Sequence, residues 1–133
     1  MLALRNENCT TYLKHMENVE LINLNNICIS VEGDYFQISF QNTEGEQEPY
    51  FLVQCDFETP DARCYIESDR EHLIGHYHVN QVTINNGTFL IQYGERNKYG
   101  VAIKYSATEL QQMHLEKVSK QMFYKRVLIG YEC

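Results

Sequence analysis

Three histidines close together are the first residues whose spacing suggests chemistry. On a β-strand, His76 and His78 would point to the same side, so they can bind one divalent cation. His72, Cys64 or Glu67 would then supply further ligands. The alternative is that these imidazoles decorate the solvent face of a strand. Because His-x-His without a fixed third ligand is a weak pattern, we expect no metal and no other cofactor.

Cysteine and histidine together are also the components of a nucleophilic pair. Cys55 and Cys64 are the candidates for the thiolate, with the same histidines as base. Their spacing does not require such a pair, and cysteine is among the residue types most often buried. The sequence contains no Gly-x-Ser-x-Gly elbow, phosphate-binding glycine loop or His-Glu-x-x-His helix. We therefore expect that the chain is not an enzyme.

The number and spacing of the cysteines indicate the compartment. There are five cysteines in 133 residues, with no Cys-x-x-Cys spacing. A small secreted scaffold would use an even number, so we expect free thiols in a reducing cytoplasm. The first residues lack a basic and apolar secretory signal, and no apolar run is long enough to cross a membrane. We expect a cytoplasmic protein.

Acidic residues are concentrated in the middle of the chain. The net charge is −7, and residues 44–71 contain nine acidic residues against Arg63 and Arg70. Aromatic residues interleave with them, and aromatic side chains beside charges often anchor interfaces. The alternative is a solubilising surface. The predicted partner-binding residues are Glu44, Glu46, Glu48, Tyr50, Glu58, Asp61, Tyr65, Glu67, Asp69, Glu71 and Tyr77.

This charge distribution narrows the class of partner. Nucleic acid needs clustered Lys and Arg to hold its phosphates, so we expect no direct nucleic-acid binding. We also expect no membrane partner. A protein with a basic surface fits better, because complementary potentials speed encounter and select partners.

Strand patterns dominate the sequence that must position these residues. Asn85-Asn86-Gly87 predicts a hairpin between Gly75–Ile84 and Thr88–Gly94, and Tyr99–Tyr105 extends it into a meander. Further strand-like runs, in which apolar and polar residues alternate, lie between Val19 and residue 68. Residues 1–18 are either a short helix or a flexible extension. The tail, Tyr124–Tyr131, is expected to add one more strand.

One helix follows the strands. We predict it at 107–122, opened by a capping box of Ser106 and Glu109, with Leu110, Met113, Val118 and Met122 forming its apolar stripe. The stripe is expected to pack across the meander. The predicted fold is α+β: a single domain over 1–133, with an antiparallel sheet of six to eight strands and a C-terminal helix on one face.

The order of these features resembles the tenth family of immunity proteins from bacterial polymorphic-toxin systems. The resemblance covers about residues 27–120. It rests on the segments Ile27–Glu32, Tyr50–Gln54, Cys64–Glu67, the hairpin Val79–Ile84 with Thr88–Tyr93, and Tyr99–Ile103. It implies a small cytoplasmic protein that binds and blocks a co-encoded toxin. The extension before residue 27 and the His72–His78 segment depart from that pattern.

We therefore expect an immunity protein that neutralises a cognate toxin through an acidic, aromatic surface. The first alternative is a structural or self-assembling module in which an exposed edge strand, Tyr124–Tyr131, pairs with a second copy to form a homodimer. The second alternative is a metal-binding protein or enzyme that uses His72, His76 and His78.

Overall fold

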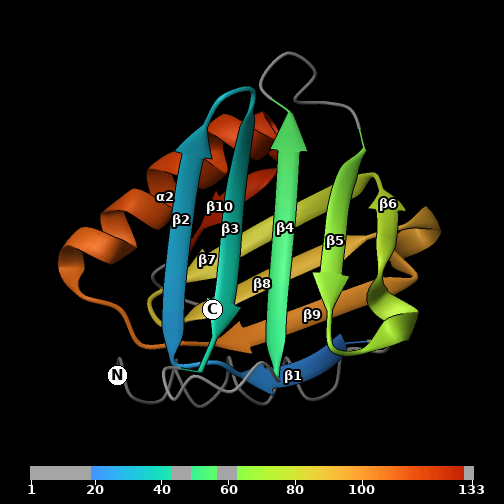
Figure 1. Ribbon diagram of the computed structural model, residues 1–133, viewed down its shortest axis with the longest axis horizontal. Coiled ribbons are helices and arrows are strands. Elements are labelled where there is room, and N and C mark those ends of the chain that lie inside the picture. The colour runs from blue at the N-terminus through green and yellow to red at the C-terminus, as the bar shows by residue number, and fades with distance from the viewer. Residues whose placement is uncertain (1–18, 43–48, 57–62, 131–133) are drawn as a thin grey trace.

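The described part of the protein forms two facing β-sheets and one long helix (Figure 1). The computed structural model describes residues 19–42, 49–56 and 63–130. The first sheet has the order β1 (Val19–Asn23), β9 (Tyr99–Lys104), β8 (Thr88–Tyr93), β7 (Val79–Asn85) and β10 (Val127–Ile129). The second has the order β2 (Asn26–Glu32), β3 (Tyr35–Gln41), β4 (Tyr50–Asp56), β5 (Cys64–Ser68) and β6 (Gly75–Tyr77).

The strands of the two sheets cross at a steep angle in Figure 1, with β2–β5 in front of β7–β9. Every pairing in the second sheet is antiparallel. In the first sheet the predicted β7–β8–β9 meander is confirmed, while β1 and β10 add to its edges in parallel. The fold is α+β, as predicted, but the described residues form two sheets of five strands rather than one sheet of six to eight.

One predicted strand is divided between the two sheets. The run Gly75–Ile84 is interrupted at His78, so β6 pairs with β5 while β7 pairs with β8. The chain thereby crosses from the second sheet to the first. The predicted hairpin at Gly87 (φ 93°) and the predicted strand in the tail, β10, are both present. The prediction for residues 1–18 lies outside the described residues.

The helix α2 (Glu109–Phe123) confirms the predicted helix and corrects its cap. Thr108, not Ser106, is the N-cap: its Oγ1 accepts from Gln111 N at 3.1 Å, and Gln111 Oε1 accepts from Thr108 N at 2.8 Å. The same reciprocal bonding therefore occurs two residues later, with Gln in place of Glu. Short 3₁₀ turns stand at η1 (Glu71–Leu73), η2 (Glu95–Asn97) and η3 (Tyr124–Arg126).

The buried face of α2 also differs from the prediction. Val118 and Met122 are buried, but Leu110 and Met113 are 78% and 67% exposed. The rest of the buried face is Leu115, Ser119 and Phe123. Since α2 contacts β7 and β10 as well as β2 and β3, it packs against both sheets instead of lying across the meander.

The core lies between the sheets and against the helix. Alternate residues of each strand enter it, as Phe51, Val53 and Cys55 do on β4. Tyr93 is fully buried, and its hydroxyl donates to Leu73 O at 3.1 Å. Burial and the charges around it raise the pKa of Tyr93, so this buried phenol stays neutral.

Two of the cysteines form a disulfide, which corrects the prediction of free thiols. Cys55 and Cys64 are bonded across β4 and β5, with their Cα atoms 4.8 Å apart. Both side chains are buried. Cys28 is free and exposed, whereas Cys9 and Cys133 lie outside the described residues. Sequence spacing alone could not indicate this bond, because it depends on the register of the two strands.

Candidate functional site

The outer face of the second sheet is mainly polar. Alternation sends most apolar residues of β3, β4 and β5 into the core and leaves mainly polar residues, with Leu52 among them, facing outward. One row across this face follows directly from the strand register. It consists of Ser30, Gln37, Gln54, Tyr65 and His76. None of these is a carboxylate, so the negative charge of the face is concentrated elsewhere.

Glu67 is held between two tyrosine hydroxyls on this face. Tyr50 donates to Glu67 Oε2 at 2.9 Å, and Tyr65 donates to Glu67 Oε1 at 2.7 Å. Tyr65 lies two positions away on the same strand, and Tyr50 is diagonal to Glu67 on β4, beyond its direct neighbour Leu52. We call Tyr50, Tyr65 and Glu67 the carboxylate clamp. Each carboxylate oxygen keeps a lone pair for another donor.

The clamp changes the acidity of both tyrosines. Burial, followed by the hydrogen bond and charge of Glu67, raises the pKa of Tyr50 to about 12. For Tyr65 the hydrogen bond to Glu67 is the largest cause of a raised pKa. A carboxylate beside a phenol disfavours the phenolate. Both tyrosines therefore remain neutral hydrogen-bond donors at neutral pH.

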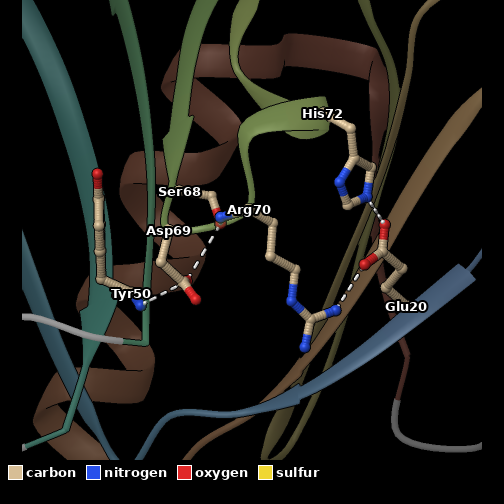
Figure 2. A network of polar contacts seen from close by, with 6 residues as sticks. All are labelled: Glu20, Tyr50, Ser68, Asp69, Arg70 and His72. Carbon is tan, nitrogen blue, oxygen red and sulfur yellow. Dashed lines mark hydrogen bonds and ion pairs between the residues drawn. The ribbon is translucent and has the colours of Figure 1, made fainter.

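Asp69 fixes the edge of the clamp (Figure 2). Its Oδ1 accepts from Tyr50 N at 3.1 Å and from Ser68 Oγ at 3.4 Å. Ser68 Oγ in turn accepts from Arg70 N at 3.1 Å. These bonds join the start of β4 to the end of β5, so the backbone that carries Tyr50 is held beside Glu67.

A second carboxylate links the two sheets beside this point. Glu20 of β1 contacts Arg70 Nη1 and His72 Nε2, each at 2.5 Å (Figure 2). Burial would raise the pKa of Glu20, but hydrogen bonds and charge from His72 and Arg70 outweigh it and lower the pKa. This contact fastens the connection between β5 and β6 to the first sheet.

The structure brings only part of the predicted surface together. Tyr50, Tyr65, Glu67 and Asp69 meet at one end of the β4–β5 pair. Glu71 is exposed in η1. The remaining predicted acids, Glu44, Glu46, Glu48, Glu58 and Asp61, lie outside the described residues.

The predicted binding residue Tyr77 is half-buried and packs against the core. Its strand partner is the buried Cys64, so the ring faces inward and packs against Tyr93 and Tyr99, with ring centroids 5.1 and 5.0 Å apart. Sequence alternation places Tyr77 on the side opposite to its neighbour His76. The ring of His76 packs against that of Tyr65 in a tilted arrangement, with the ring centroids 5.1 Å apart. The roles of Glu20 and Arg70 were not predicted, because residues so far apart in the chain carry no local signal of their contact.

The residues of the metal and nucleophile alternatives lie on separate elements or are already bonded to other side chains. The break at His78 removes the shared strand that would align it with His76, and His72 binds Glu20. In the described ranges, no group of three or more His, Cys, Asp or Glu side chains is placed to hold a metal ion. Cys55 and Cys64 are joined to each other, so neither is a thiolate nucleophile or a ligand in this structure.

No protein-family model, curated protein or solved structure matches this chain. Across the described residues, no helix has the length and apolar character needed to cross a membrane.

Proposed function

We propose that this chain is a binding protein that neutralises a cognate toxin, using the outer face of the second sheet against a basic surface of that toxin. The carboxylate clamp is the observation that carries the proposal. Glu67 is already oriented by two hydroxyls before any partner arrives, so little side-chain entropy is lost on binding. A Lys or Arg of the partner can bind the remaining lone pairs of this carboxylate.

The surroundings of the clamp support a protein partner. Aromatic rings beside a charge are typical of the residues that carry most of the energy of an interface. The neighbouring row contains glutamine, serine and histidine, which can make hydrogen bonds without adding charge. A toxin that binds nucleic acid would present Lys and Arg, and the clamp would occupy them in place of phosphates.

The proposal that this chain is an immunity protein rests on its resemblance to that family in the order of its strands. Membership of the family would imply the cytoplasm as its compartment. The Cys55–Cys64 disulfide is instead typical of oxidising compartments. Alkylation of the thiols in living cells, followed by mass measurement, separates the two. Blocked thiols on both residues would support the cytoplasm, and an intact disulfide would contradict it.

We propose no catalytic step. Cys55 and Cys64, the predicted nucleophiles, are bonded to each other. Within the residues described here, the histidines do not belong to any group of three or more side chains placed to hold a metal ion. The proposed action is occlusion of the toxin's active surface.

Growth protection tests the proposal. The probe is the proposed cognate toxin, expressed with and without this chain. The wild-type chain should restore growth and co-purify with the toxin, while Glu67→Gln should do neither. Glu109→Gln, an exposed carboxylate in the first turn of α2, is the matched control and should protect fully. Equal protection by both variants would reject the clamp as the binding element.

A homodimer through β10 is the second candidate. This strand lies at the end of its sheet, and Leu128 on it is 54% exposed. An exposed edge with an apolar side chain favours pairing with another copy. Light scattering should show a dimer that Leu128→Lys converts to a monomer. A monomeric wild-type chain at high concentration would exclude this candidate.

A further inference from the structure

A basic hollow lies where the second sheet joins the first. Its volume is about 440 Å³. Three separate segments line it: the start of β5, the β6–β7 connection and the reversal that contains η2. It is lined by Arg63, His76, Tyr77, His78, Asn80, Gly94, Glu95 and Arg96.

The charges in this hollow are not balanced. Arg63 and Arg96 are both exposed, and neither guanidinium forms an ion pair with a carboxylate among residues 19–42, 49–56 and 63–130. Glu95 supplies a negative charge at the rim, while His76 and His78 add further N–H donors. In a chain whose net charge is −7, such a group of unpaired basic side chains attracts a small anion.

The loop that carries Arg96 is held in an unusual backbone conformation. Arg96 and Asn97 have φ values of 56° and 54°, which costs an L-residue about 1 kcal/mol each. Asn80 stabilises the loop: its Nδ2 donates to Gly94 O at 2.7 Å and to Asn97 Oδ1 at 2.8 Å. Gly94 N also donates to His78 O at 3.1 Å. The backbone at Arg96 is therefore fixed before a ligand binds.

We infer that this hollow binds the phosphate group of a small molecule, with Arg63 and Arg96 as the charged donors and His76 and His78 as further donors. Donors from three segments surround the volume, and a tetrahedral phosphate can accept from all of them. A carboxylate has only two oxygens and would leave donors unused. A long polyanion would be repelled by the acidic remainder of the molecule. The site shares no residue with the carboxylate clamp, and it adjoins the clamp where the ring of His76 lies 5.1 Å from that of Tyr65.

Titration of the isotope-labelled full chain tests this inference. The probes are inorganic phosphate, glycerol 3-phosphate and acetate, followed through the amide signals of Gly94 and Arg96. Both phosphates should give saturable shifts, and acetate should not. Equal affinities would show that the phosphate group alone is recognised, while tighter binding of the ester would assign a phosphate monoester.

Substitutions locate the site. Arg63→Gln and Arg96→Gln should each weaken phosphate binding about tenfold, as expected for loss of one charged donor. Lys117→Gln, which removes the same charge from an exposed position on α2, should leave binding unchanged. Asn80→Ala should also weaken phosphate binding, because Asn80 positions Arg96. This binding should be measured well below the melting temperature of the variant.

Three results would overturn the inference. They are shifts that fail to saturate with either phosphate, acetate binding as tight as phosphate, or equal losses in Lys117→Gln and the arginine variants. Because Arg63 and Arg96 are exposed and on different segments, the two variants test the site separately if one of them folds poorly.

Discussion

The Tyr50 hydroxyl donates to Glu67 across the β4–β5 pair at 2.9 Å, although 17 residues separate the two in the chain. The bond is diagonal, because the residue directly opposite Glu67 is Leu52. Tyr65 completes the arrangement from the same strand as Glu67. A mainly polar sheet face thus acquires one oriented carboxylate, which is the feature that the proposed function uses.

The ionisation of Tyr50 should reveal the clamp without any partner. Its pKa lies at about 12, raised from 10.0 by burial and by Glu67. Because the folded pKa is raised, the stabilisation is complete below pH 10 and is lost as the pH rises toward 12. Glu67→Gln should move the Tyr50 titration toward its ordinary value, as followed by ring chemical shifts. A Tyr50 titration that does not change in Glu67→Gln would contradict the contact.

Glu20→Gln should lower the free energy of unfolding at neutral pH by about 1 kcal/mol, the scale of a partly exposed ion pair. The pKa of Glu20 is lowered by His72 and Arg70, so its stabilisation is present above its ordinary value of 4.5 and is lost as the pH falls below that value. Urea unfolding at pH 7 and pH 3 measures both ends of this range.

The two pH values give the decisive comparison for Glu20. Wild type and Glu20→Gln should differ at pH 7 and converge at pH 3. The control is Glu32→Gln, an exposed carboxylate at the end of β2, which should follow the wild type at both. A constant difference between wild type and Glu20→Gln at both pH values would mean that the contact with Arg70 and His72 does not stabilise the fold.

Reduction of the Cys55–Cys64 bond should lower the free energy of unfolding by roughly 2–3 kcal/mol, as expected for a short closed loop. The backbone pairing of β4 with β5 does not require the bond, so the reduced chain should still fold. Urea unfolding with and without reductant measures the change. The exposed Cys28 provides the control, since Cys28→Ser should shift neither curve. Identical curves in wild type would show that the bond does not form in solution.

Local signals in the sequence were enough to predict several elements. The Asn86-Gly87 pair predicted the hairpin, and the positive φ of Gly87 (93°) is the conformation that glycine adopts most easily. The helix followed from its length and periodicity, and the α+β class followed from both. The cap was displaced to Thr108 because Ser106 and Thr108 both lie before the helix and sequence cannot rank two hydroxyls.

Features that depend on register or long-range contact were not predictable. The disulfide needs Cys55 and Cys64 at facing positions of two strands, which the loop between them does not specify. The inward ring of Tyr77 follows from its pairing with the buried Cys64, a register that the sequence does not specify. Composition was enough to name Tyr50, Tyr65, Glu67 and Asp69 as candidate binding residues. The hydrogen bonds among them were visible only in the folded chain.

Affinity for the proposed cognate toxin is the most direct test of the role of Glu67. The dissociation constant should be measured by calorimetry for wild type, Glu67→Gln and Glu109→Gln, and association rates at low and high salt. We predict about tenfold or greater weakening in Glu67→Gln, no change in Glu109→Gln, and association that slows as salt increases. Equal affinities of the two variants, or an association rate that does not depend on salt, would contradict the account.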